Sequence, residues 1–433
     1  MSGFATLASN LNLEPQKIVL FFQLWTQAGF FEEARLWESL NLIYDQNKAE
    51  YVFNYISPDL KNDNASEMII AKLDYLYNNK VLNDQDLLYF FLYQAQTAFN
   101  RELGKERDSL KCDPNNWLCG GDPQQVIAIF NKLGIIDELK PSMKSAHAIV
   151  IPGSSTKKMV KTVSKYAEDL SKLPHDNFYF LTGNRPLTKG IDGEETILEI
   201  ANNLGIKYDL TKPFIPLPSP LSGETLNCKP YIDEKDAAVY YLKKAFPGEN
   251  IEVDILTNPK LDNGFKNTSK IKIFTVEVDN LRPTTIDNAK SLYKHLESLG
   301  FSKENPANVI LIGSQPFITR QKISFENIRK EYFPNLGVKF DISAEKANLD
   351  ANNLLTIFSE TAALISEKFN QAVIDGKYQK LEQNLLKVIM FGSRKNAIEG
   401  KVLPKMPEET VPTVVIHDKA ALLLINKGYE LAK

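Results

Sequence analysis

The sequence predicts a mixed α/β fold, in which a domain with a parallel sheet follows an all-α N-terminal domain. Up to about residue 140, apolar residues recur at three- and four-residue intervals, which is the spacing of an amphipathic helix. From residue 146 onward, short and continuously apolar runs alternate with helical segments, beginning with AHAIVI at Ala146–Ile151. Such runs are typical of strands that are covered on both faces of a parallel sheet.

The length of the chain and the change of pattern together predict three parts. A chain of 433 residues exceeds the size of one ordinary domain. We expect a helical domain at residues 1–140 and a parallel α/β domain at residues 141–345. Residues 346–433 are expected to form a helical C-terminal extension that packs on the α/β domain.

Helical patterning dominates the first part. Pro15 suits a first helical turn, and further helices are expected at residues 33–55, 66–79, 84–104 and 123–133. The segment LLYFFLYQAQTAF at residues 87–99 is rich in aromatic residues. This density favours a helix–helix core, with a surface for a protein partner as the alternative.

The second part alternates strands and helices. After Ala146–Ile151, the expected strands are Asn177–Leu181, Ile251–Leu256, Ile271–Val276, Asn308–Gly313 and Val338–Ile342. The expected helices are Lys157–Leu170, Glu194–Leu204, Asp233–Phe246 and a segment that Gly300 ends. Strands joined by helices of this length form βαβ units with parallel strands. In the third part we expect helices at Asn352–Phe369 and Lys380–Met390, a strand at Thr413–His417 and a final helix.

Composition excludes several classes of protein. A formal net charge of −3 argues against a general nucleic-acid-binding protein, which needs a basic face. The first residues carry neither the basic nor the hydrophobic part of a secretory signal, and no early apolar run is long enough to span a membrane. Three cysteines and four histidines show no spacing typical of a disulfide framework or a zinc site, so no metal is expected. We expect a cytoplasmic protein, either of the producing cell or of a host cell if the chain is a secreted effector.

Two loops that follow predicted strands carry small and polar residues. Gly153, Ser154 and Ser155 precede a helix, where backbone N–H groups and the helix dipole can bind an anion. An ordinary tight turn is the alternative. In the second loop, Gly183 and Asn184 precede Arg185, whose guanidinium can bind phosphate or carboxylate, or can pair with a neighbouring acid.

Two further loops are expected at the same edge of the sheet, because the carboxyl ends of parallel strands meet there. The helix entrance after Arg282 is more polar than capping requires, and the turn after Asn308–Gly313 is also polar. The candidate ligand-binding residues of these loops are Thr284, Thr285, Asn288, Ser314, Gln315 and Arg320. Asp287 and Glu234 are the candidates for acid–base catalysis, with solvated or capping roles as the alternative.

These motifs, in this order, resemble the YdcF/SanA/ElyC-like family of bacterial domains over about residues 146–341. The resemblance is carried by IVIPG at Ile149–Gly153, LTGNR at Leu181–Arg185, an acid-and-alanine helix start at Asp233–Ala237, and above all TTIDNA at Thr284–Ala289. A strand with a polar turn and a downstream Arg320 completes the pattern. The sequence departs from the family around Pro316 and Phe317, where a histidine is usual, and in a long proline-rich insertion.

The resemblance implies a Rossmann-like sheet with a polar pocket at its edge. The expected ligand is an anionic, nucleotide-like or phosphorylated small molecule, and an adenosine- or phosphate-containing cofactor would fit the same pocket. If the protein is an enzyme, group transfer or hydrolysis is the expected class of reaction. The alternative is a non-enzymatic bacterial effector or regulator whose helical domain binds a protein partner.

Overall fold

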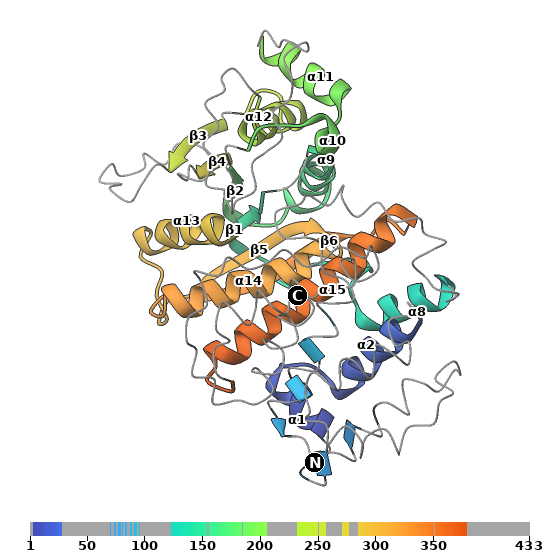
Figure 1. The fold of residues 1–433 in the computed structure, drawn as a ribbon. Helices are drawn as coiled ribbons and strands as arrows, with labels where there is room; N and C mark the ends of the chain where they lie inside the picture. The colour runs from blue at the N-terminus through green and yellow to red at the C-terminus, as the bar shows by residue number, and fades with distance from the viewer. Residues whose placement is uncertain are drawn as a thin grey trace, which may run out of the picture. The chain divides into compact units, whose positions relative to one another are not determined.

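The computed structural model forms two compact units, which are described separately. It describes residues 3–27, scattered positions between 70 and 95, and residues 123–153, 156–183, 185–205, 232–249, 251–256, 271–276, 285–349 and 351–378. One unit is Ile136–Ala347, and the other combines Met1–Ile135 with Asn348–Lys433. Figure 1 shows the helices and strands of both.

The unit Ile136–Ala347 is built on a six-stranded sheet in which every pair of neighbouring strands is parallel. The strands are β1 (Ala146–Ile151), β2 (His175–Gly183), β3 (Ile251–Leu256), β4 (Ile271–Val276), β5 (Ala307–Ser314) and β6 (Val338–Glu345). Their order across the sheet is β3-β4-β2-β1-β5-β6. The prediction of a mixed α/β fold with a parallel sheet is confirmed.

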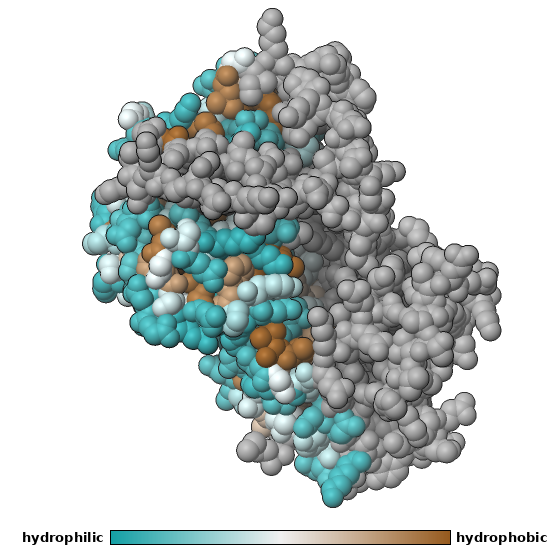
Figure 2. Space-filling model, turned by 90° about the vertical axis from the view of Figure 1, so that its left-hand side faces the viewer, coloured by the Kyte–Doolittle hydropathy of each residue, from teal (hydrophilic) through white to brown (hydrophobic). Residues whose placement is uncertain are grey.

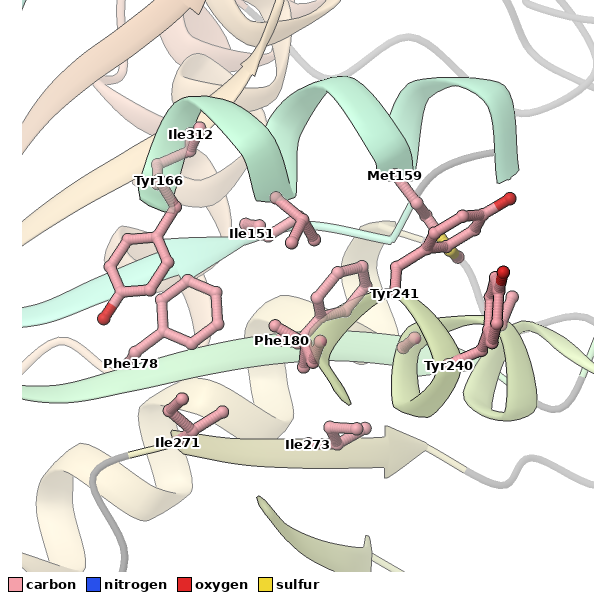
Figure 3. Packing of buried hydrophobic residues seen from close by; sticks show 14 of the residues in the cluster. Ile151, Met159, Tyr166, Phe178, Phe180, Tyr240, Tyr241, Ile271, Ile273 and Ile312 are labelled. Atoms are coloured by element: carbon pink, nitrogen blue, oxygen red, sulfur yellow. The ribbon is translucent and has the colours of Figure 1, made fainter. Parts of the chain in front are cut away.

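Alternate residues of the central strands pack on opposite faces of this sheet. Ile149 and Ile151 of β1 and Phe178 and Phe180 of β2 belong to one core cluster. This cluster also contains residues of α9 (Thr156–Lys165), α11 (Glu194–Leu204) and α12 (Glu234–Ala245). Figure 3 shows Met159, Tyr240 and Tyr241 among these side chains.

The opposite face is covered by α13 (Thr285–Ser298) and α14 (Phe317–Tyr332). Ala148 and Val150 of β1 and Tyr179 of β2 pack here with Leu292 and Phe325. Because both faces are covered, the middle of each central strand is apolar on both sides, which explains the continuous apolar runs in the sequence.

The order of the strands reverses at β1. From β1 the chain first forms β2 and then, further out, β3 and β4, before α13 leads to β5 on the other side of β1 (Figure 1). In open α/β sheets, ligands bind at the carboxyl ends of the strands where the order reverses in this way. The boundary between β1 and β5 is therefore the place to look for a site.

Two details of the helices differ from the sequence prediction. The structure ends α9 at Lys165 and continues with a π-helical turn at Tyr166–Leu170, where one helix was expected. It also forms α14 directly after β5, where the sequence predicted only a polar turn.

The described part of the helical unit contains α1 (Gly3–Asn10), α2 (Pro15–Gln27), α8 (Pro123–Leu133) and α15 (Ala351–Ile374). The ring centroids of Phe130 in α8 and Phe358 in α15 lie 5.0 Å apart. Asn10 donates a hydrogen bond of 3.0 Å from its side-chain amide to the hydroxyl of Tyr378. Residues on both sides of the α/β unit in the sequence thus share one helical unit.

Several predicted elements lie outside the described residues. These are the helix at 33–55, most of the helices at 66–79 and 84–104, the helix Lys380–Met390 and the strand Thr413–His417. The packing of residues 346–433 on the α/β domain stays a prediction.

Few large hydrophobic side chains are exposed among the described residues. Figure 2 shows one face, on which hydrophobic patches are separated by hydrophilic residues. The exposed large hydrophobic side chains are Val160, Ile286, Leu299 and Tyr332. Within the part of the chain that the structure describes, no helix is both long and apolar enough to cross a membrane.

Candidate functional site

Gly153, immediately after β1, lies against two neighbouring elements. A Cβ atom at this position would be 3.1 Å from the carbonyl oxygen of Leu181 and 3.2 Å from Nδ2 of Asn288. Contacts this close are tighter than most side chains allow, so glycine permits the approach of α13 to the end of β1. The same position is 3.9 Å from Oε2 of Glu234.

Asn288 presents an unusual buried acceptor at this point. It is the fourth residue of α13, and its side chain is 7% exposed. Its Oδ1 has no hydrogen-bond partner among the described residues. A buried polar atom left without a partner costs about 1–3 kcal/mol, so such atoms in folded proteins call for an explanation.

Glu234 reaches the same place from the start of α12. Asp233 caps this helix by accepting a hydrogen bond from the backbone N–H of Asp236, whose carboxylate accepts one from Asp233 N–H. The cap fixes the first turn and aims Glu234 at the ends of β1 and β2. Burial raises the pKa of Glu234, and the positive charge of Arg185 opposes this effect.

Arg185 is held between two carboxylates. Its Nε donates to Oε1 of Glu234 at 2.6 Å, and its two terminal nitrogens donate to both oxygens of Asp192 at 3.1 and 3.2 Å. Burial alone lowers the pKa of Arg185, but the charges of Glu234 and Asp192 outweigh it and raise the pKa. This ion pairing is the alternative that the sequence left open for Arg185, and its predicted role in anion binding stays a prediction.

Asp192 joins this arrangement to the start of α9. Its Oδ1 accepts from the backbone N–H and from the hydroxyl of Thr156, both at 3.2 Å. Its Oδ2 accepts from Thr188 N–H at 2.9 Å. A carboxylate of the protein itself therefore binds at the N-terminal end of α9, where the sequence predicted a cradle for a foreign anion.

A lysine lies on the other side of β1. The ammonium group of Lys158, in the first turn of α9, is 3.1 Å from the centroid of the Phe317 ring at the start of α14. Since α9 follows β1 and α14 follows β5, this cation–π contact spans the boundary where the strand order reverses. It brings a positive charge to the carboxyl edge of the sheet.

The remaining predicted residues are distributed around this edge. Ser314 ends β5, and Gln315 donates its N–H to Glu345 O and accepts from the Thr319 hydroxyl. Thr285 and Asp287 lie half-buried in the first turn of α13, and Arg320 is half-buried on α14. Four predicted residues lie outside the described part of the chain: Ser154, Ser155, Asn184 and Thr284.

The structure thus gathers five predicted residues and one that was not predicted. We call them the carboxyl-edge cluster: Gly153, Gly183, Arg185, Asp192, Glu234 and Asn288. Gly183 joins it through its N–H, which donates to Oε2 of Glu234 at 3.4 Å. No short motif in the sequence marks Asp192, Thr156 or Lys158; the contacts Thr156–Asp192 and Lys158–Phe317 join residues that are distant in the sequence.

Among the described residues, no group of three or more His, Cys, Asp or Glu side chains is arranged to hold a metal ion. A comparison of the chain with protein-family models, curated proteins and solved structures gives no match.

Proposed function

We propose that the chain is a Rossmann-like, YdcF-like protein with an all-α N-terminal domain, which binds a nucleotide-like or phosphorylated small molecule at the carboxyl edge of its sheet. The observation that carries this proposal is the unpaired, buried Oδ1 of Asn288 beside Gly153. Asn288 lies beside the carboxyl end of β1, the strand at which the strand order reverses. A hydrogen-bond donor of a ligand would satisfy this atom.

The charges divide the site into two parts. In the carboxyl-edge cluster, the carboxylates of Asp192 and Glu234 flank the single guanidinium of Arg185. Lys158, beside Phe317, supplies positive charge at the β1/β5 boundary. We assign the anionic part of the ligand to the side of Lys158, and its uncharged polar part to the cluster.

Glu234 is the acid–base candidate of this site. Its carboxylate combines a pKa raised by burial with a side chain that is 12% exposed and lies near Gly153. A group of this kind can move a proton in group transfer or hydrolysis, and perturbed carboxyl groups of this kind are common in active sites.

The test is a thermal-shift screen of the full chain with AMP, ADP, ATP, S-adenosylmethionine and glucose 6-phosphate, followed by calorimetry on each hit. We expect at least one of these ligands to raise the melting temperature. Lys158→Met should weaken its binding about tenfold, which corresponds to about 1.4 kcal/mol.

Lys161→Met is the matched control, because Lys161 lies on the same helix and is exposed. It should leave the affinity unchanged. Failure of every ligand to bind would refute the proposal, and equal effects of the two substitutions would refute the role of Lys158.

A further inference from the structure

We infer that the carboxyl-edge cluster is a subsite for the hydroxyl groups of a sugar, and that a ribose hydroxyl donates a hydrogen bond to Oδ1 of Asn288. This inference rests on the proposed function and names the part of the ligand that each half of the site recognises. It predicts that the protein distinguishes ribose from deoxyribose.

The atoms of the cluster that can still form hydrogen bonds are acceptors. Oδ1 of Asn288 is buried and has no partner among the described residues. Oε2 of Glu234 lies near the same point and accepts only the long 3.4 Å bond from Gly183 N–H among the bonds described for it. Asn288 and Glu234 both approach Gly153, and an acceptor on each suits a group that donates hydrogen bonds, such as a hydroxyl.

A phosphate is unsuited to this position. The guanidinium of Arg185 is already bound by two carboxylates, and the N–H of Thr156 at the start of α9 is bound by Asp192. A phosphate here would meet the negative charge of Glu234, while Arg185 and the Thr156 N–H are already bound by carboxylates of the protein. A sugar hydroxyl carries no charge and avoids this repulsion.

The experiment compares AMP, 2′-deoxy-AMP and 3′-deoxy-AMP by calorimetry on the full chain, so that the phosphate and the base stay constant. We expect wild-type protein to bind AMP at least about tenfold more tightly than one of the two deoxy analogues. The Asn288→Ala variant should bind AMP only as weakly as wild-type protein binds that analogue. Its affinity for the analogue itself should equal that of wild-type protein.

Two substitutions accompany Asn288→Ala. Asn203→Ala makes the same change at an exposed position of α11 and should preserve the preference for AMP. Gly153→Ala crowds Asn288 without removing it and should reduce the preference. The preference is first measured on wild-type protein, so it does not depend on the folding of a variant.

The possible outcomes separate the two proposals. Equal binding of AMP and both analogues overturns the hydroxyl subsite and leaves the proposed function intact. A preference of unchanged size in Asn288→Ala and Gly153→Ala also overturns it. If neither AMP nor its analogues bind, the subsite is refuted, whereas the proposed function fails only if the whole ligand screen fails.

Discussion

Arg185 illustrates how a residue that looks ready to bind a ligand can instead hold other residues in place. It is 3% exposed, and the side chain of Asp192, its bidentate partner, is fully buried. Replacing one member of a buried ion pair leaves its partners charged and unpaired, which costs far more than the pair contributes on balance. The triad of Arg185, Asp192 and Glu234 therefore fixes the direction of Glu234 and the start of α9 together.

We expect Arg185→Met to lower the free energy of unfolding by about 3–5 kcal/mol, because two buried carboxylates lose their cation. Lys189→Met is the comparison, since its ion pair with Glu194 is about half-exposed on both sides and should contribute at most about 1 kcal/mol. Urea denaturation at pH 7 measures both. Similar losses in the two variants would show that the triad contributes no more than a surface pair.

Asp233 should make stability depend on pH. Burial, followed by the charge of Asp236, raises the pKa of Asp233 from 3.8 to about 6. An acid whose pKa is higher in the folded protein than in the unfolded chain favours folding most when protonated. Its contribution is therefore complete below about pH 4 and is lost as the pH rises through 6.

Asp233→Asn removes this titration and keeps a good helix cap. We expect the variant to match wild type near pH 4 and to exceed it by about 1–3 kcal/mol at pH 7.5, as measured by urea denaturation at both values. A difference between the proteins that does not change with pH would contradict the assignment.

Site residues could be predicted from the sequence where one short segment was unusually polar or began a recognisable helix. Asn288 stands in a run more polar than a helix start requires, and Glu234 opens a predicted helix, so both were predicted as site residues. Asp192 was not predicted, because it lies in a short turn without a recognisable motif and its contact with Thr156 joins residues 36 apart in the sequence.

At the scale of elements, strands were easier to predict than the helices that follow them. Central strands such as β1 are short and almost continuously apolar because both faces are covered, and their length and flanking turn residues favour a strand over a buried helix. The buried residues of α14 include Ser324 and Asn327, so its covered stripe does not look apolar in the sequence. The π-helical turn at Tyr166–Leu170 likewise carries a helical pattern and cannot be separated from α9 by periodicity.

The packing of α14 depends on Gly313 at the end of β5. A Cβ atom there would lie 2.9 Å from Cδ1 and 3.1 Å from Cβ of Ile318. Gly313→Ala should therefore cost about 1–3 kcal/mol through overpacking. Ile318→Val removes Cδ1, so the double variant should lose less stability than the sum of the two single variants.

Gly300→Ala provides the contrast for this cycle. A Cβ atom at Gly300 would have no described atom within 4 Å, but Gly300 has a φ of +84°, so the cost of about 1 kcal/mol comes from the backbone alone. That cost should simply add to the cost of Ile318→Val. Additivity in the Gly313 cycle, measured by thermal denaturation, would contradict the proposed contact.

At the scale of the whole molecule, the α/β unit is one continuous segment of the chain, whereas the helical unit combines segments from both sides of it. Both core clusters of the sheet are made only of residues between 136 and 347. We therefore expect the fragment 136–347 to fold alone, with a cooperative urea transition and a circular-dichroism spectrum of mixed helix and strand. The fragment 1–135 lacks Phe358 and Tyr378 and should unfold without a cooperative transition. The opposite behaviour of the two fragments would contradict this division.

The split of the helical unit between the two ends of the chain has a consequence for its synthesis on the ribosome. Residues 1–135 emerge first, but α15 is made only after the whole α/β unit has been translated. At ribosomal rates this interval is on the order of ten to forty seconds. During that time Phe130 has no Phe358 to pack against, because Phe358 has not yet been synthesised, while the sheet can already form. The part of the protein that is translated first is thus the last to complete its core.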